Sequence, residues 1–182
     1  MIYTIEAFIV ASIFVYFLAD FYFEFKLGVT TVASSERAVK SIIGFIPADF
    51  NGKVVDFGSA WGGLVMAIAR ARPKSSVTGL EFSLFPYLLS AFRLKISRIG
   101  NLKVLREDFF KFPLNDKNIV VCYLPDPMMK NLSEKFRSEL PAGALIISHD
   151  YPIPEWKADT EITFTDMFIK VTIYVYEIKK AS

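Results

Sequence analysis

Two hydrophobic patterns follow one another along the chain, one typical of strands and the other of helices. From residue 53 onwards, short runs rich in Val, Ile and Leu are separated by longer segments whose apolar positions recur every three to four residues. We predict five strands here, over residues 53–57, 76–81, 102–105, 118–123 and 144–148. The helices predicted before and between them cover about 36–46, 63–72, 83–98 and 128–140.

The end of the chain changes to a period of two, which is typical of half-buried strands. Glu161–Phe164 and Phe168–Ile178 alternate in this way and predict an antiparallel hairpin. The five earlier strands are apolar throughout, which indicates a parallel sheet covered by helices on both faces. The predicted class is therefore α/β, with a mostly parallel seven-stranded sheet that ends in an antiparallel hairpin.

The first 25 residues have a different character from the rest. Ala7–Ala19 contains no charged residue, and the apolar character extends back to Met1 with only Glu6 interrupting. A helix over these nineteen residues is roughly 28 Å long, close to the hydrocarbon thickness of a bilayer. We predict that residues 1–25 form an apolar membrane-anchor helix, followed by a globular domain over residues 26–182. Lys26, Arg37 and Lys40 all follow the segment, which places that domain in the cytoplasm. The alternative is a helix buried in the domain or in a dimer contact.

Composition narrows the range of partners. The net charge of +2 gives no sign of a nucleic-acid partner. A single cysteine, Cys122, and a single histidine, His149, exclude an internal disulfide and argue against a metal site built from these residues. We therefore expect neither nucleic acid nor metal. Mean hydropathy is +0.36 with 53% hydrophobic residues, which is high for a soluble globular protein and agrees with membrane contact.

The junction after the first predicted strand has the character of a ligand-binding turn. In sheets of this class, ligands bind at the carboxyl ends of the strands. Here the chain reads DFGSAWGG from Asp56, and Gly58 and Gly62 allow the backbone to approach a ligand closely. The spacing is not the G-x-G-x-x-G of dinucleotide sites, and Asp56 at the strand end would repel a phosphate. An acid in this place favours a ligand that carries an ammonium and a sulfonium.

Two further acids follow the next two strands. Glu81 ends the second predicted strand, where a carboxylate can accept both hydroxyls of a ribose. Asp108 follows the third strand and could accept from an amino group of an adenine, with Phe82 or Phe109 against the ring. An ordered set of three acids, each at a strand end, indicates one nucleoside-containing ligand more strongly than any of the three alone.

These segments together resemble a known family. The series VVDFGSAWGG, VTGLEFS, LREDFF, VCYLPDP and ELPAGALIISHDYPIPEW is similar to the seven-stranded, Rossmann-like class I methyltransferases, which use S-adenosylmethionine. It is most similar to the protein-lysine methyltransferases that include the mitochondrial enzymes for the c protein of the ATP synthase and the adenine nucleotide translocase, with their prokaryotic relatives. The resemblance implies methylation of a lysine side chain, with a membrane-associated protein as the favoured substrate.

The resemblance also implies roles for particular residues. Asp56, Gly58, Ser59 and Gly62 would contact the cofactor, Glu81 its ribose and Asp108 its adenine, and residues 32–35 would close over it. The chain departs from the family's D-x-G-S-G-D-G-R at three positions. These hold Ala60 in place of Gly, Trp61 in place of Asp and Gly63 in place of Arg. Ala60 is unfavourable by about 1 kcal/mol or more if its φ has to be positive, and Trp61 either covers the cofactor or packs elsewhere.

The candidate acceptor side follows the fourth strand. Each proline of Tyr123-Leu124-Pro125-Asp126-Pro127 restricts the residue before it, so the Leu124 carbonyl and the Asp126 carboxylate are held in fixed directions. We predict Tyr123, Leu124, Pro125, Asp126 and His149 as the catalytic side of the site. His149-Asp150 follows the neighbouring fifth strand. Capping of the next helix by Asp126, or a structural hydrogen bond from His149, is the alternative for each.

Two questions stay open at this point. Residues 83–98 are apolar nearly all round and end in Arg93, Lys95 and Arg98, so this helix could rest on anionic lipid as well as on the sheet. The function also has alternatives to lysine methylation. One is a methyltransferase for a small or lipid-soluble acceptor, and the other is a non-catalytic S-adenosylmethionine-binding protein, which the changes at Ala60 and Trp61 keep in consideration.

Overall fold

Strands and helices alternate in the order that the hydrophobic pattern predicts. The structure is a computed structural model, and it describes residues 6–8, 11–12, 15, 34–166 and 168–179. Four helices lie in the main part of the chain: α2 (Glu36–Gly44), α3 (Gly63–Ala71), α4 (Leu84–Ser97) and α5 (Asp126–Glu139). The strands are β1 (Lys53–Phe57), β2 (Ser76–Leu80), β3 (Leu102–Leu105), β4 (Ile119–Cys122), β5 (Leu145–His149), β6 (Thr160–Asp166) and β7 (Ile169–Glu177).

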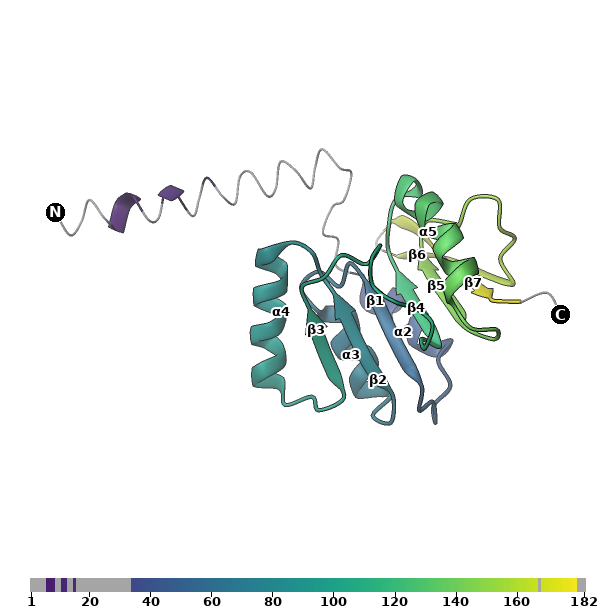
Figure 1. The fold of residues 1–182 in the computed structure, drawn as a ribbon, viewed down its shortest axis with the longest axis horizontal. Helices are drawn as coiled ribbons and strands as arrows, with labels where there is room; N and C mark the ends of the chain where they lie inside the picture. The colour runs from purple at the N-terminus through teal and green to yellow at the C-terminus, as the bar shows by residue number, and fades with distance from the viewer. Residues whose placement is uncertain (1–5, 9–10, 13–14, 16–33, 167, 180–182) are drawn as a thin grey trace. The chain divides into compact units, whose positions relative to one another are not determined.

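The seven strands form one sheet in the order β3-β2-β1-β4-β5-β7-β6 (Figure 1). β1 to β5 run parallel, and β7 pairs antiparallel with both β5 and β6. The predicted parallel sheet with a closing antiparallel hairpin is confirmed. The strand order reverses between β1 and β4, and a sheet of this kind opens a crevice for a ligand at such a point. Asp56 occupies this position, because it is in register with Gly79 of β2 and Val121 of β4.

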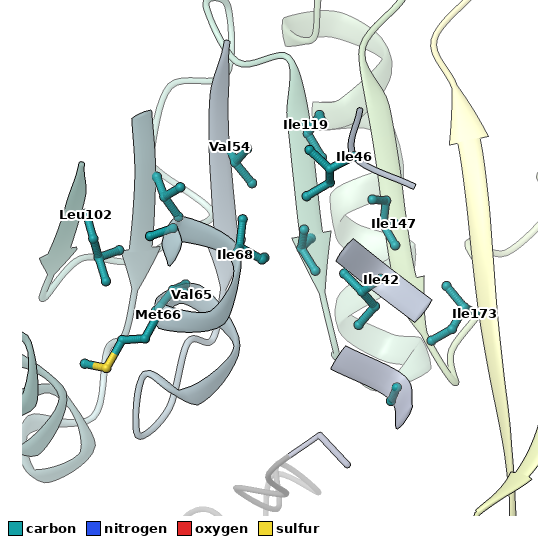
Figure 2. Packing of buried hydrophobic residues seen from close by; sticks show 14 of the residues in the cluster. Ile42, Ile46, Val54, Val65, Met66, Ile68, Leu102, Ile119, Ile147 and Ile173 are labelled. Carbon is teal, nitrogen blue, oxygen red and sulfur yellow. The ribbon is translucent and has the colours of Figure 1, made fainter. Parts of the chain in front are cut away.

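Each face of the sheet carries its own hydrophobic core. On one face, Ile42 and Ile46 from the α2 region and Val65 and Ile68 of α3 pack on the strands (Figure 2). Side chains of α4 pack at the edge of the same cluster. On the other face, Met129, Leu132 and Phe136 of α5 cover β1, β4 and β5. This burial on both faces explains why the parallel strands are continuous apolar runs.

The helix ends follow local chemistry. The Ser35 hydroxyl accepts a hydrogen bond from the amide of Ala38 and caps α2. α5 starts at Asp126, two residues before the predicted start at Met128. Pro127 is tolerated because an amide in the first helical turn has no acceptor within the helix to lose. Asp126 is therefore the first residue of the helix and Pro125 is its N-cap, so the alternative of Asp126 as the N-cap is wrong.

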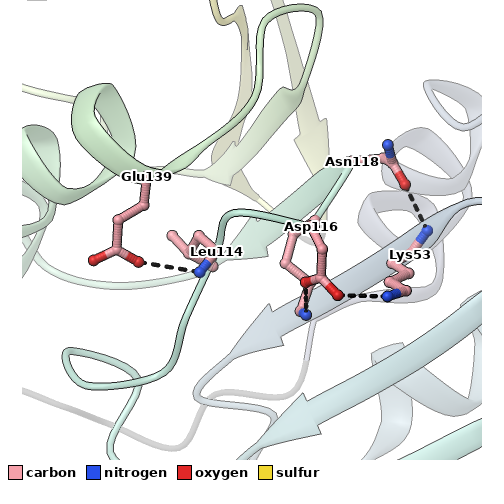
Figure 3. Close-up of polar contacts among 6 residues, drawn as sticks. Lys53, Leu114, Asp116, Asn118 and Glu139 are labelled. Carbon is pink, nitrogen blue, oxygen red and sulfur yellow. Dashed lines mark hydrogen bonds and ion pairs between the residues drawn. The ribbon is translucent and has the colours of Figure 1, made fainter.

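Polar contacts hold the opposite, amino edge of the sheet together. Asn118 accepts the amide of Lys53 at 2.8 Å, and Glu139 of α5 accepts the amide of Leu114 at 3.0 Å (Figure 3). Asp116 pairs with the ammonium groups of Lys53 and Lys117, and these hydrogen bonds lower its pKa to about 2. The last part of the loop between β3 and β4 is thereby fixed at the edge away from the predicted site.

The amino-terminal segment is described only at six positions. Residues 6–8, 11–12 and 15 are helical, and most of the predicted anchor over residues 1–25 lies outside the described residues. Within the ranges that the structure describes, no helix combines the length and the apolar character needed to span a bilayer.

Candidate active site

The predicted site residues follow the carboxyl ends of five adjacent strands. Asp56 lies in β1, Glu81 directly follows β2, Asp108 comes three residues after β3, Tyr123 follows β4 and His149 ends β5. Because these strands are parallel neighbours, their carboxyl ends lie at one edge of the sheet. The site therefore divides into a cofactor half after β1, β2 and β3 and an acceptor half after β4 and β5.

The turn after β1 is held in place by its backbone. Gly58, Ala60 and Gly62 have positive φ values of 74°, 48° and 78°. The amides of Gly58 and Ser59 both donate to the Leu80 carbonyl of β2, at 3.0 and 2.8 Å. The glycines are needed because side chains rarely adopt this conformation. Ala60 adopts it at a cost, so the substitution noted in the sequence strains the turn.

Gly79 of β2 provides the space that this turn occupies. A Cβ at Gly79 would lie 2.8 Å from the Ser59 hydroxyl oxygen and 2.9 Å from Ser59 Cβ. Any side chain at position 79 would therefore push the turn away from the sheet. The sequence pattern did not single out this residue, although a glycine inside a strand is itself a sign of a close backbone approach.

Glu81 connects the turn to the start of α4. Its Oε2 accepts the amide of Ala60 and its Oε1 accepts the amide of Ser83, both at 2.8 Å. The backbone thus orients the carboxylate through both of its oxygens. Its contact with a ribose stays a prediction.

Asp56 is a buried acid near the end of β1, directly before the turn. Burial, together with the charge of Glu81, raises the pKa of its carboxyl to about 8. A ligand that brings a positive charge would stabilise the ionised form of this carboxyl, which burial and Glu81 disfavour. The hydroxyl of Ser59, also buried, has no hydrogen-bond partner among the described residues. A buried acid at the end of β1 and an unpartnered hydroxyl in the turn that follows fit the ammonium-bearing end of S-adenosylmethionine.

The predicted adenine contacts lie after β2 and β3. Asp108 is partly exposed, and its Oδ1 accepts the amide of Phe110 at 3.0 Å. Phe109 stacks on the buried ring of Phe57, with ring centres 5.2 Å apart, so one face of Phe109 already belongs to the core. Phe82 is exposed at the same edge. Contact of these residues with adenine stays a prediction.

Trp61 packs against α4. Its ring meets Phe85 edge-on at 5.7 Å, and its carbonyl accepts a hydrogen bond from Arg93 at 2.7 Å. Of the two roles considered for Trp61, these contacts favour packing. They also tie the turn to α4.

The acceptor half is an aromatic cluster. The Tyr123 ring lies against the His149 ring, with centres 4.1 Å apart, and the Tyr151 ring is 5.8 Å from that of Tyr123. Burial raises the pKa of Tyr123 to about 12, and the charge of Asp150 and its hydrogen bond with the phenol add to the shift. Burial lowers the pKa of His149, against the opposing effect of Asp150. Both rings are therefore uncharged at neutral pH.

Asp150 organises this cluster from a strained position. Its φ is 62°, and the amide of Tyr151 donates across it to the His149 carbonyl at 2.8 Å. The Asp150 Oδ1 accepts the amide of Thr172 in β7 at 2.8 Å, and Oδ2 is 3.5 Å from His149 Nε2. In the sequence, Asp150 stands out only as the neighbour of His149. Its link to Tyr123 and β7 depends on tertiary structure and leaves no signal in the sequence.

The remaining predicted residues differ in their burial and in the segments that they contact. His149 Nδ1 is 3.3 Å from the hydroxyl of Ser34, so the segment before α2 meets the end of β5. The Leu124 side chain is buried in the core, and its Cδ2 is the atom that a Cβ at Gly58 would meet, at 3.5 Å. Asp126 is exposed at the start of α5. The structure therefore brings Tyr123 and His149 together, while the Leu124 side chain supports the cofactor turn.

Comparison with known proteins agrees with this geometry. The model of the ANTKMT methyltransferase domain matches residues 56–160, more than half of the chain. The adenine nucleotide translocase lysine N-methyltransferase of Mus musculus is 30% identical over 72% of this chain and 57% of its own length. The ATP synthase c-subunit lysine N-methyltransferase of Rattus norvegicus is 28% identical over 74% of this chain and 61% of its own length. The chain thus spans about three fifths of each of these relatives.

A solved structure shares the fold. The RNA methyltransferase from Salinibacter ruber, in complex with S-adenosyl-L-homocysteine, has a TM-score of 0.75 at 20% identity, and the match covers 83% of this chain and 96% of that one. The predicted methyltransferase class is confirmed by the family, and the predicted Rossmann-like fold by this structural match. The chain belongs to the family of the ANTKMT methyltransferase domain.

Proposed function

We propose that this protein transfers a methyl group from S-adenosylmethionine to a lysine side chain of a protein. The observation that carries the proposal is the pairing of two unlike half-sites across the β1–β4 reversal. One half has the buried acid Asp56 beside Glu81, and the other has the aromatic cluster of Tyr123, His149 and Tyr151. The similarity to two lysine N-methyltransferases supports lysine as the acceptor.

The cofactor half would hold its ligand by charge and by preset hydrogen bonds. On binding, Asp56 would release its proton and attract the ammonium of the amino acid end, and the Ser59 hydroxyl would bond to the same end. The carboxylate of Glu81, which the amides of Ala60 and Ser83 already orient, would accept hydrogen bonds from the ribose hydroxyls. S-adenosylmethionine supplies an electrophilic methyl group on its sulfonium.

The acceptor half would receive the lysine between aromatic rings. An ammonium is attracted to the faces of tyrosine rings, so the substrate can enter in its charged form. Transfer requires the neutral amine, and a half-buried aromatic surrounding lowers the pKa of an amine. Asp150 would oppose this change if it faced the amine directly, but its carboxylate is engaged with Tyr123 and Thr172. The methyl group then moves to the nitrogen lone pair, and positioning with exclusion of water provides the rate.

We further propose that the substrate is a membrane-associated protein and that the enzyme itself is attached to a membrane with its domain in the cytoplasm. The uncharged stretch Ala7–Ala19, with basic residues only after it, supports this proposal. After cell lysis and ultracentrifugation, the full-length chain should sediment with membranes and be released by detergent. Recovery in the supernatant would contradict the proposed attachment.

A labelled-methyl assay tests the activity. Full-length protein is incubated with methyl-labelled S-adenosylmethionine and host membranes, and label is followed in protein bands and in an organic extract. We expect label in a protein band that yields methyllysine on acid hydrolysis. Label only in the organic extract would replace lysine by a lipid-soluble acceptor. No transfer despite cofactor binding would indicate a non-catalytic binding protein. Glu81→Gln provides the negative control, because it should lose the label in either case.

A further inference from the structure

The outer face of α4 is apolar and uncovered in the described part of the chain. Leu88, Phe92 and Ile96 are 52%, 60% and 64% exposed, and they follow one another at intervals of four residues. This spacing places them on one side of the helix, as a stripe roughly 12 Å long. We call these three residues the α4 stripe. Single exposed apolar side chains are common, but an ordered row along one helix is a sign of an interaction surface.

The core does not account for the stripe. The opposite side of α4 already packs on the domain, with Pro86 and Ser90 buried and Tyr87 and Leu94 at the edge of the core. The helix is thus apolar on two sides, and only one of them contacts the sheet. Burial of the stripe would need a second surface outside the domain.

The charges around the stripe indicate what that surface is. Residues 83–98 contain Arg93, Lys95 and Arg98 and no Asp or Glu, and all three basic residues are exposed. If two copies met through this face with twofold symmetry, these like charges would be brought together. An anionic bilayer instead meets both features, because it takes apolar side chains below the headgroups and attracts the basic residues at their level.

We propose that the α4 stripe docks on the surface of an anionic membrane, with α4 lying in the interface. The helix begins three residues after Glu81, so this docking places the start of α4, next to the cofactor half, at the bilayer. The inference depends on neither the predicted anchor over residues 1–25 nor the identity of the methyl acceptor. It gives the domain a membrane contact of its own.

A fluorophore at the stripe reports this contact even when another segment holds the chain on the membrane. Cys122 is buried and is the only cysteine, so Phe92→Cys in the full-length protein can be labelled selectively with an environment-sensitive dye. The matched control is Ile169→Cys, which replaces a residue that is 67% exposed near the opposite edge of the sheet. The probes are vesicles of phosphatidylcholine alone and of phosphatidylcholine with phosphatidylserine, with nitroxide-labelled lipid as the quencher.

We expect the dye at position 92 to shift to the blue and to become quenchable on vesicles that contain phosphatidylserine, while the dye at 169 changes little. An unchanged signal at 92 would overturn the proposal. A dye at 92 that is already shielded without lipid would overturn it too, because another part of the chain or a second copy then covers the stripe. Light scattering separates these two cases by mass.

The basic residues provide a second test in the labelled protein. Lys95→Gln with Arg98→Gln should raise the lipid concentration at half-maximal response about twenty-five-fold, since each basic residue near an anionic surface contributes about fivefold. Lys74→Gln with Lys157→Gln removes the same charge from other exposed positions and should have a much smaller effect. Equal responses of the two pairs would contradict docking through α4. Binding of S-adenosylhomocysteine, measured by calorimetry, should be unchanged in every variant, which separates this test from one of the methyltransferase site.

Discussion

The two halves of the site at the carboxyl edge are built by different means. In the cofactor half, three positive φ values in one turn, the two amides on Leu80 and the two amides on Glu81 set the geometry. In the acceptor half, side chains set the geometry, through the ring contacts of Tyr123 with His149 and Tyr151. The backbone contributes strain there through Asp150.

This difference indicates which half can change without loss of the other. A turn fixed by backbone bonds loses its shape when a glycine or the anchoring carboxylate changes. An aromatic cluster can exchange one ring for another while its backbone stays in place. We therefore expect substitutions in the cofactor half to act on cofactor affinity, and substitutions in the acceptor half to act on turnover with cofactor affinity preserved.

The largest effect should come from Glu81→Gln. The amide keeps the size of the side chain, but it removes the charge that would accept two ribose hydroxyls and places a donor against one of the amides of Ala60 and Ser83. Hydrogen bonds to a charged group contribute about 1.5–3 kcal/mol each, so the loss in affinity should be roughly a hundredfold or more. Calorimetry with S-adenosylhomocysteine measures it, and Glu107→Gln, at an exposed position nearby, is the control. Unchanged affinity for Glu81→Gln would remove Glu81 from the cofactor site.

The next effect is a dependence of cofactor affinity on pH. Burial and the charge of Glu81 raise the pKa of Asp56 to about 8, so below this pH a cationic ligand has to displace a proton. Affinity for S-adenosylmethionine should therefore rise by up to about tenfold per unit from pH 6 to 8 and then level off. Asp56→Asn should bind more weakly and lose this slope. The same slope in Asp56→Asn and in the native chain would assign the titration to another group.

The stability of the ligand-free protein should change in the opposite direction. The unfolded chain releases the Asp56 proton near its ordinary pKa of 3.8, whereas the folded protein retains it up to about pH 8. Since the folded state holds more protons in this range, its stability falls as the pH rises through it. Asp56→Asn should thus unfold at a higher temperature than the native chain near pH 8. Thermal unfolding of the two proteins at this pH measures the difference.

Most of the fold could be predicted because strands that are buried on both faces of the sheet consist of continuous apolar residues. The strands from β1 to β5 are apolar runs, and the acids stand out at their ends. The hydrophobic pattern indicates the ends of helices and strands less sharply than their positions. α5 starts at Asp126 because a proline in the first turn loses no hydrogen bond, and β6 continues to Asp166 through exposed residues whose ladder with β7 needs no apolar pattern.

The parts of the site that depend on tertiary contacts could not be predicted. Ser34 and His149 are 115 residues apart in sequence and meet only because α2 packs beside the hairpin. The crowding of Gly79 by Ser59 requires the turn to fold back over β2. The positive φ of Asp150 follows from its bonds to Thr172 in β7. Each involves two segments whose proximity the sequence pattern does not contain.

In the acceptor half, Tyr123→Phe should lower turnover without weakening the cofactor. The substitution keeps the ring on His149 but removes the hydroxyl that engages Asp150, leaving that carboxylate to face the incoming amine. Loss of one such hydrogen bond should lower kcat by about tenfold. Tyr87→Phe on α4 is the control. If the affinity for S-adenosylhomocysteine fell along with kcat, the two halves would not be independent.

The smallest expected effect, a gain, tests the backbone side of the comparison. Ala60 has a φ of 48°, a conformation that glycine adopts without the steric cost that an alanine incurs. Ala60→Gly keeps the amide that donates to Glu81 Oε2 and relieves this strain, so it should stabilise the protein by about 1 kcal/mol and leave turnover per bound cofactor unchanged. Chemical denaturation measures the gain. Gly63→Ala is the control, because an added Cβ there meets nothing within 4 Å. A loss of stability in Ala60→Gly would mean that the methyl group of Ala60 makes contacts that outweigh the strain of its turn.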